Sequence, residues 1–160
     1  WLRELGYQTG AGCMVGSPCQ TVEHLADDIE FFRDWQPDMA GIGPYIPHPD
    51  TPYASSETGT LEMTLKMIAL ARIVTRNALL PATTAIGSIE EQGREMALEA
   101  GADVVMPNYT PLKYREHYEI YPNKRCISED PELCHGCMRM RIQSVGRTVS
   151  TDHGHSRKSR

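Results

Sequence analysis

The sequence lacks three features that would each define a class of protein. It contains no hydrophobic run long enough to span a membrane and no secretory signal peptide at its start. It also lacks the Gly-x-Gly-x-x-Gly turn of dinucleotide-binding domains. These absences argue against a membrane protein, a secreted protein and a nucleotide-binding domain built on that turn. With 40% apolar residues among 160, the chain can still bury a core.

Cationic clusters are also scarce. The formal net charge is −5, and the basic end of the chain, residues 153–160, carries neither aromatic side chains nor apolar periodicity. A few cations without aromatics, here Arg157, Lys158 and Arg160, form a weak electrostatic footprint for a nucleic acid. We therefore predict that residues 148–160 form a disordered tail, and that the protein binds neither nucleic acid nor a membrane.

The chain has five cysteines but no secretory signal. This combination predicts a reducing, cytoplasmic compartment, in which metal binding or free thiols are more frequent than disulfides. Cys13 and Cys19, near the end of the first predicted strand, are interpreted as packing or surface thiols.

The other three cysteines, Cys126, Cys134 and Cys137, are spaced C-x7-C-x2-C, and the last two begin a helical pattern over residues 134–145. Three thiolates suit an iron–sulfur cluster that lacks one protein ligand. Zinc is an alternative, with His135 or water as the fourth ligand, and so is the absence of any metal. We predict a metal site here, with an iron–sulfur cluster as the first choice.

Short apolar runs between turn signals predict buried parallel strands. Four occur, at residues 12–16, 38–42, 79–86 and 103–106. A helical pattern follows each run. The first helix is indicated by an apolar stripe over 21–35, and the second is expected to start at Thr60. The third is expected to begin with a capping box of Ser88 and Glu91 and to stop at Gly101. The fourth is expected to open at the pair Thr110-Pro111.

Residues 43–52 contain four prolines and directly follow an apolar run. Proline fixes φ and has no N–H to donate, so this segment cannot be the interior of a helix or strand. It is predicted to be a stiff loop at the carboxyl end of a buried strand, where α/β proteins place their chemistry.

Four successive βα units form half of a (β/α)8 barrel or most of a doubly wound sheet. Residues 1–7 resemble the end of a helix, which favours a chain that starts inside a domain. We predict an α/β fold: the C-terminal half of a barrel over residues 1–122, a cysteine-containing helical extension over 123–147, and the tail. A doubly wound domain is the alternative.

Several motifs together resemble one family. They are residues 10–16, 42–52, 81–85 and 105–108, and the C-x7-C-x2-C spacing. Over residues 1–147 the sequence resembles the radical S-adenosylmethionine maturases of [FeFe] hydrogenase. Biotin synthase and methylornithine synthase share the barrel and the glycine-rich strand, but they resemble the proline-rich loop and the cysteine triplet less well.

The resemblance implies reductive cleavage of S-adenosylmethionine at a [4Fe-4S] cluster, which yields a 5′-deoxyadenosyl radical for building the diiron active-site cluster of the hydrogenase. The family holds that cluster with a C-x3-C-x2-C loop, which this sequence lacks. The resemblance therefore implies a fragment whose [4Fe-4S] ligands lie outside the chain, with a possible second iron–sulfur cluster at the C-terminal cysteines. The implied partners are a small-molecule or iron-complex substrate and other hydrogenase maturation proteins.

The resemblance also implies site residues. Those near the cofactor are Gly12, Met14, Gly16, Met39 and Tyr118; those around the substrate are Thr83, Thr84, Met106 and Tyr121. Each has a plainer interpretation, because methionines fill cores and tyrosines three residues apart cover a helix surface. The adjacent threonines point to opposite faces if their strand is extended.

Two other functions are compatible with the sequence. One is a biotin synthase-like or methylornithine synthase-like reaction on a small organic acid. The other is a zinc-binding interaction module, with the cysteine triplet as a structural site and the basic tail as a partner contact. Metal content would separate the second of these from the enzymes.

Overall fold

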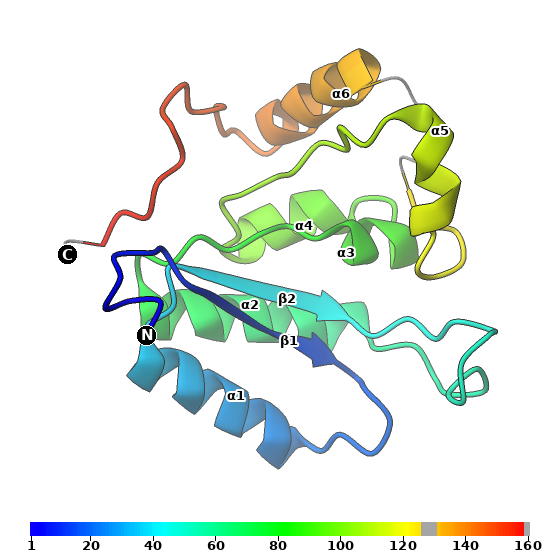
Figure 1. The fold of residues 1–160 in the computed structure, drawn as a ribbon, viewed down its shortest axis with the longest axis horizontal. Coiled ribbons are helices and arrows are strands. Elements are labelled where there is room, and N and C mark those ends of the chain that lie inside the picture. The colour runs from blue at the N-terminus through cyan, green and yellow to red at the C-terminus, as the bar shows by residue number, and fades with distance from the viewer. Residues whose placement is uncertain (126–130, 159–160) are drawn as a thin grey trace.

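The computed structural model describes residues 1–125 and 131–158 (Figure 1). Its elements, in chain order, are β1 (Gly10–Val15), α1 (Val22–Trp35), β2 (Met39–Pro44), α2 (Leu61–Thr75), α3 (Thr84–Ile89), α4 (Gly93–Ala100), α5 (Leu112–Arg115), the 3-10 helix η1 (Glu116–Tyr118) and α6 (Pro131–Ser144). The fold is mixed α/β, as predicted. No helix of the described residues is long and apolar enough to cross a membrane.

The strands run parallel. β1 pairs with β2 in a register that joins Gly10 to Met39 and Val15 to Pro44. A third extended segment continues the order through a parallel bridge between Met39 and Leu79, and a fourth joins it through a parallel bridge between Pro81 and Val104. Each of the four predicted apolar runs therefore contributes an extended segment that is parallel to its neighbour.

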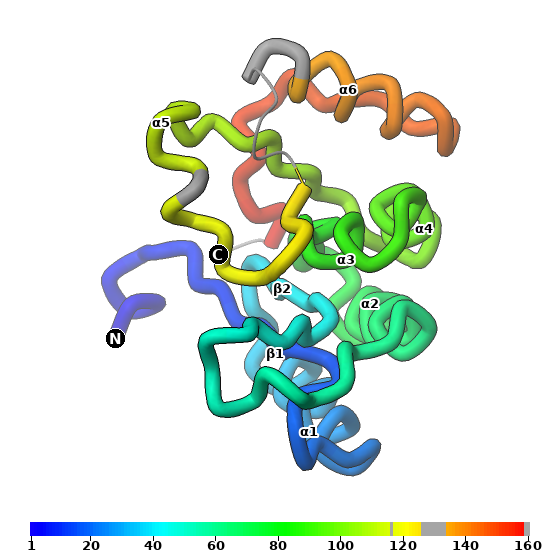
Figure 2. Tube along the Cα trace, turned by 90° about the vertical axis from the view of Figure 1, so that its right-hand side faces the viewer, coloured from blue at the N-terminus to red at the C-terminus, as the bar shows by residue number. Residues whose placement is uncertain are grey.

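The two faces of these segments differ sharply. Successive side chains of a strand point to opposite faces, and in β2 the buried Ala40 and Ile42 pack in the hydrophobic core while Gly41 and Gly43 face the other way. In β1, Val15 belongs to the same core, whereas Met14 is 59% exposed. Figure 2 shows α1, α2 and α4 as an arc along one side of β1 and β2. One face is thus covered by helices, and the other is glycine-rich and open.

The first two helices start where the sequence predicts. The Thr21 hydroxyl accepts a hydrogen bond from the N–H of His24 and caps α1, and the Thr60 hydroxyl accepts one from the N–H of Met63 at 3.3 Å and caps α2. α4 stops at Gly101, also as predicted. The short helix α5 follows Pro111.

Three local predictions are wrong. The third strand does not reach Ile86, because Thr84 already begins α3, from which Ile86 enters the core. Ser88 and Glu91 form no capping box: Ser88 lies within α3 and its hydroxyl donates to the Thr84 carbonyl oxygen at 3.0 Å. The last helix starts at Pro131, ahead of the cysteines, since proline fits the first turn of a helix.

Both ends of the described chain lie on the same side of the molecule (Figure 1). Residues 1–7 form a turn in which Gly6 N–H donates to Arg3 and Tyr7 N–H donates to Leu2, the bonding pattern of a helix C-terminus, as predicted. The tail lies nearby, since the Lys158 ammonium donates to the Pro37 carbonyl oxygen at 2.6 Å. Disorder of residues 148–160 stays a prediction.

We expect the 160-residue chain to self-associate. In the described residues β1 pairs on one side only, and the open face beside it carries the exposed Met14. Unpaired strand edges and apolar faces are templates for association. Size-exclusion chromatography with light scattering should show oligomers of the unaltered chain. The variant Met14→Lys should form oligomers of lower mass. A monomer at all concentrations, with a cooperative melt, would contradict this expectation.

Candidate functional site

A cavity of about 490 Å³ lies at the carboxyl ends of the parallel segments. It is bounded by the open sheet face, by the loop after β2 and by the segment after η1. Its lining residues are Cys13, Met14, Gly41, Gly43, Pro44, Tyr45, Ile46, His48, Thr51, Tyr53, Thr83, Ala85, Ile120 and Tyr121. Residues 45–52 of the proline-rich segment form a loop that borders the cavity, as predicted from their composition, whereas Gly43 and Pro44 still belong to β2. We call this cavity the glycine-lined hollow.

The loop is held over the strand ends by backbone hydrogen bonds. The N–H of Tyr45 donates to the carbonyl oxygen of Val15 at 2.8 Å, and the N–H of Gly59 donates back to Tyr45 at 2.8 Å. Gly16 leaves β1 with a φ of +84° directly beneath Gly59. These contacts tie the end of β1 to both ends of the loop, so the wall of the hollow is fixed by main chain rather than by side chains.

Neutral hydroxyl groups face this hollow. The Thr83 hydroxyl oxygen is buried and has no hydrogen-bond partner among the described residues. Burial raises the pKa of the half-buried Tyr121, and the Ser88 hydroxyl and the positive charge of Arg94 only partly offset this increase. Tyr121 is thus held as a neutral phenol. Such groups can donate to a polar ligand without adding charge.

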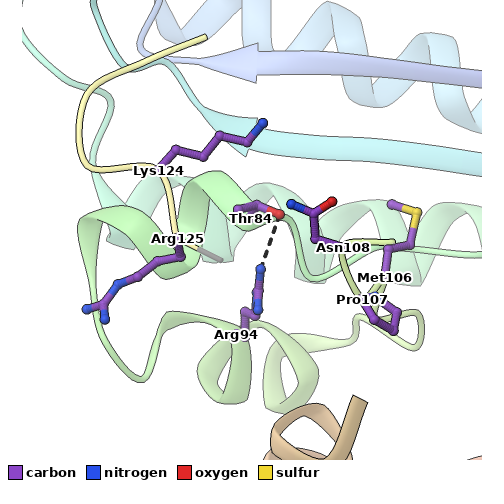
Figure 3. Close-up of a pocket in the computed structure, with 7 residues that line it drawn as sticks. All are labelled: Thr84, Arg94, Met106, Pro107, Asn108, Lys124 and Arg125. Atoms are coloured by element: carbon purple, nitrogen blue, oxygen red, sulfur yellow. Dashed lines mark hydrogen bonds between the residues drawn. The ribbon is translucent and has the colours of Figure 1, made fainter. Parts of the chain in front are cut away.

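A second hollow, of about 200 Å³, lies between α3, α4 and the segments around residues 107 and 124. Figure 3 shows its seven lining residues: Thr84, Arg94, Met106, Pro107, Asn108, Lys124 and Arg125. The Arg94 guanidinium is 6% exposed and donates to the Thr84 hydroxyl at 3.1 Å. Three cationic side chains border this space, which we call the cationic hollow.

The predicted substrate residues are divided between the two hollows. Thr83 and Tyr121 line the glycine-lined hollow, whereas Thr84 and Met106 line the cationic one. The division arises because Thr83 is the extended N-cap of α3 and Thr84 is its first residue. Turning the backbone into a helix therefore does not bring the two hydroxyls together.

The predicted cofactor residues lie mostly on the open sheet face. Met14 lines the glycine-lined hollow, and Gly12 and Met39 lie further back along β1 and β2. Gly16 marks the end of β1. Tyr118 is 58% exposed in η1 and is not among the residues that line either hollow.

The three cysteines of the triplet are not seen together. Cys126 lies outside the described residues, Cys134 is buried on α6, and Cys137 is half-buried one turn later. Burial would lower the pKa of Arg141, but its hydrogen bond to Cys137 and its pairing with Glu95 raise it. Across residues 1–125 and 131–158, no three His, Cys, Asp or Glu side chains are grouped to hold a metal. The metal site stays a prediction.

The two remaining cysteines behave as predicted. Burial raises the pKa of the Cys13 thiol to about 12, and the Asp28 carboxylate adds to the shift. Cys13 is therefore a packing thiol. Cys19 is exposed.

Sequence reasoning missed Arg94 and Lys124. The sequence did contain a signal for Arg94. Ala97 and Leu98 follow it by three and four residues, a spacing that places all three on the same, buried face of α4. An arginine on an apolar stripe predicts a buried charge. Lys124 offered no such signal, since it lies in an irregular segment.

The pair Gly12 and Gly41 allows a sharp test of why β1 contains glycine. A Cβ at Gly12 would overlap the carbonyl oxygen of Gly41, whereas a Cβ at Gly41 would lie 4.0 Å from its nearest neighbour, the carbonyl oxygen of Ala11. We expect Gly12→Ala to lower the free energy of unfolding by about 1–3 kcal/mol. The control Gly41→Ala should change it by no more than about 0.5 kcal/mol. Equal effects in urea denaturation would refute the assigned close contact.

The metal content of the chain tests the cysteine triplet without knowledge of how the three cysteines are arranged. After anaerobic reconstitution, the chain should contain iron and sulfide, and Cys137→Ala together with Cys134→Ala should remove both. The exposed Cys19 supplies the matched control, since Cys19→Ala should leave the iron content unchanged. Iron content that survives in the double variant would sink the cluster prediction, and colourless stoichiometric zinc would support the zinc alternative.

No family model matches the chain. Among curated proteins, it is 50% identical over 153 residues to the [FeFe] hydrogenase maturase subunit HydE of Thermotoga maritima. The match covers 96% of this chain but 44% of the relative, so the chain spans less than half the length of the protein it matches. The predicted resemblance is thereby confirmed: over nearly its whole length, the chain is similar to the C-terminal part of an [FeFe] hydrogenase maturase.

Proposed function

We propose that this chain is part of a radical S-adenosylmethionine enzyme that acts in the maturation of [FeFe] hydrogenase in the cytoplasm. The observation that carries the proposal is the 50% identity to HydE over 96% of the chain. The hydrogenase active-site cluster is the product that the proposed enzyme helps to build. Its substrate would be a small molecule or an iron complex, and other maturation proteins would be its partners.

The arrangement of the strands supports the C-terminal half of a (β/α)8 barrel. The four parallel segments follow one another in space in their chain order, without a reversal. The open face consists of glycines with Met14 and Met39, while the opposite face packs against the helices. A doubly wound sheet would carry helices on both faces and would reverse its strand order at a switch point. In a section of barrel wall, helices cover only the outer face of the sheet, and the strands follow one another in chain order.

The glycine-lined hollow suits S-adenosylmethionine. Gly41 and Gly43 place no side chain between a ligand and the backbone, and Met14 offers an apolar contact beside them. When bound at a reduced [4Fe-4S] cluster, this cofactor supplies a 5′-deoxyadenosyl radical. The cluster itself does not fit this chain, because the sequence has no C-x3-C-x2-C motif. We therefore propose only cofactor contacts for this chain. Met14 would contact the cofactor in the hollow, and the remaining proposed contacts, which do not line it, are Gly12, Gly16, Met39 and Tyr118.

The substrate would lie at the carboxyl ends of the strands. Thr83 provides a buried hydroxyl that lacks a partner within the described chain, and Tyr121 provides a neutral phenol on the same wall. Thr84 and Met106 border the adjoining cationic hollow. In this proposal the hydroxyls orient a polar substrate, while Met14 and the loop after β2 exclude water.

A chimeric protein tests the function. The segment of Thermotoga maritima HydE that lies outside the match would be joined to this chain. Because half of the matched residues are identical, we expect the chimera to form the complete fold. Under anaerobic reducing conditions it should release 5′-deoxyadenosine from S-adenosylmethionine and support maturation of an [FeFe] hydrogenase.

The outcomes separate the two parts of the proposal. A folded, cluster-loaded chimera that releases no 5′-deoxyadenosine would contradict the radical enzyme. Release of 5′-deoxyadenosine without active hydrogenase would contradict the maturation role alone. The joined HydE segment without this chain is the control, and it should do neither.

A further inference from the structure

Arg94 is a buried cation, and none of the side chains that the structure describes gives it a carboxylate partner. Its guanidinium donates to the Thr84 hydroxyl at 3.1 Å and to the Met138 sulfur at 3.2 Å, and its Nε has no hydrogen-bond partner among the described residues. A thioether is a weak acceptor and a hydroxyl is neutral. Charged side chains are rarely fully buried unless they are paired, because removing them from water is costly. Among the described side chains, the charge of Arg94 therefore has no carboxylate counterpart.

Two other partly buried arginines of the described chain are paired with acids. Arg72 contacts Asp103 at 3.0 Å, and Arg141 contacts Glu95 at 2.6 Å. Glu95 directly follows Arg94 in α4, yet it turns to α6 instead. The acid next to Arg94 in its helix is thus engaged elsewhere, although Arg94 is more buried than either paired arginine.

The packing around Arg94 is built to admit its long side chain. A Cβ at Gly87 would lie 3.3 Å from the Arg94 Nε and 3.4 Å from its Cγ. Gly87 occupies the middle of α3, where glycine weakens a helix. The side chain crosses α3 at this glycine and ends at Thr84, on the wall of the cationic hollow (Figure 3).

Lys124 lines the same hollow and adds a second positive charge. Arg125 also borders it, but in Figure 3 its guanidinium points away from Arg94 and Thr84. The hollow measures about 200 Å³, which is below the range of about 300–1,000 Å³ of most ligand pockets and therefore suits a small ligand. A small space, a buried guanidinium and the lack of an acid among the described lining residues together define a preference for small anions.

We propose that the cationic hollow binds a compact oxyanion, with Arg94 as its principal ligand and Lys124 and Thr84 as supporting contacts. The shared chemistry is a group with two or more oxygens that can accept from a planar guanidinium, such as a carboxylate or inorganic phosphate. The bound anion supplies the negative charge that no described side chain offers to Arg94. This assignment rests on burial, charge and space, and it is independent of the radical chemistry proposed above.

Isothermal titration calorimetry of the whole 160-residue chain tests the site. It measures binding whether the chain is monomeric or oligomeric. Sodium phosphate and sodium acetate are titrated separately, against sodium chloride at equal ionic strength. We expect saturable binding of at least one oxyanion beyond the chloride control. Binding of acetate alone assigns a carboxylate ligand, and binding of phosphate alone assigns a phosphate ligand.

Variants locate the bound anion. Arg94→Met keeps the length of the side chain but removes the charge, and affinity should fall by about tenfold or more, as for the loss of a charged hydrogen bond. Arg125→Met removes an equal charge from the same hollow, and affinity should stay within about twofold because screened, exposed charges interact weakly. If circular dichroism shows that Arg94→Met does not fold, Arg94→Lys replaces it. That variant retains the charge, loses the planar fork, and should also bind more weakly.

Two results would overturn the site. One is the absence of oxyanion binding beyond chloride in the unaltered chain. The other is an equal loss of oxyanion affinity in the Arg94 and Arg125 variants. That result would mean that the anion responds to the overall positive charge and not to a specific site.

Discussion

The parallel pairing of β1 with β2 is the constraint on which the rest of the structure depends. Its register sends Val15, Ala40 and Ile42 to the helical side and leaves the glycines on the other side. Because the strands are parallel, their carboxyl ends meet at one edge, where the loop after β2 closes over Val15. A shift of one residue would exchange the two faces and remove both the core and the glycine-lined hollow.

The corner between α3 and α4 organises the second half of the site. The N–H of Gly93 donates to the Glu90 carbonyl oxygen at 3.0 Å, and this tight turn brings Arg94 back across α3. Through Arg94 the corner contacts α6, since the same guanidinium touches both Thr84 and Met138. The helix that carries Cys134 and Cys137 is therefore in direct contact with a wall of the cationic hollow.

The two hollows offer different chemistry within a short distance along the chain. Thr83 and Tyr121 present neutral hydroxyls to a space with glycine walls, while Arg94 and Lys124 present charge to a smaller one. Adjacent threonines separate these environments because one ends an extended segment and the next begins a helix. Such a division allows one ligand to be oriented by hydrogen bonds while an anionic group is held beside it.

Much of the fold follows from local chemistry that is visible in the sequence. Thr21, Thr60 and Gly101 mark helix ends because capping and turning depend on neighbouring residues alone, and the apolar runs mark the extended segments. The same reasoning failed at residues 84–91, where the apolar pattern of Thr84 to Ile86 suits a strand as well as a helix and only packing against α4 decides.

The sequence by itself determined the alternation of the strands, the major helix boundaries and the resemblance to a hydrogenase maturase. Only the tertiary structure decided that Thr83 and Thr84 face different spaces, and that Arg94 is buried without an acid from the described part of the chain beside it. The reason is physical. Capping and alternation act over a few residues, whereas burial and the pairing of a charge depend on segments that lie far apart in the chain, such as Thr84, Arg94 and Met138.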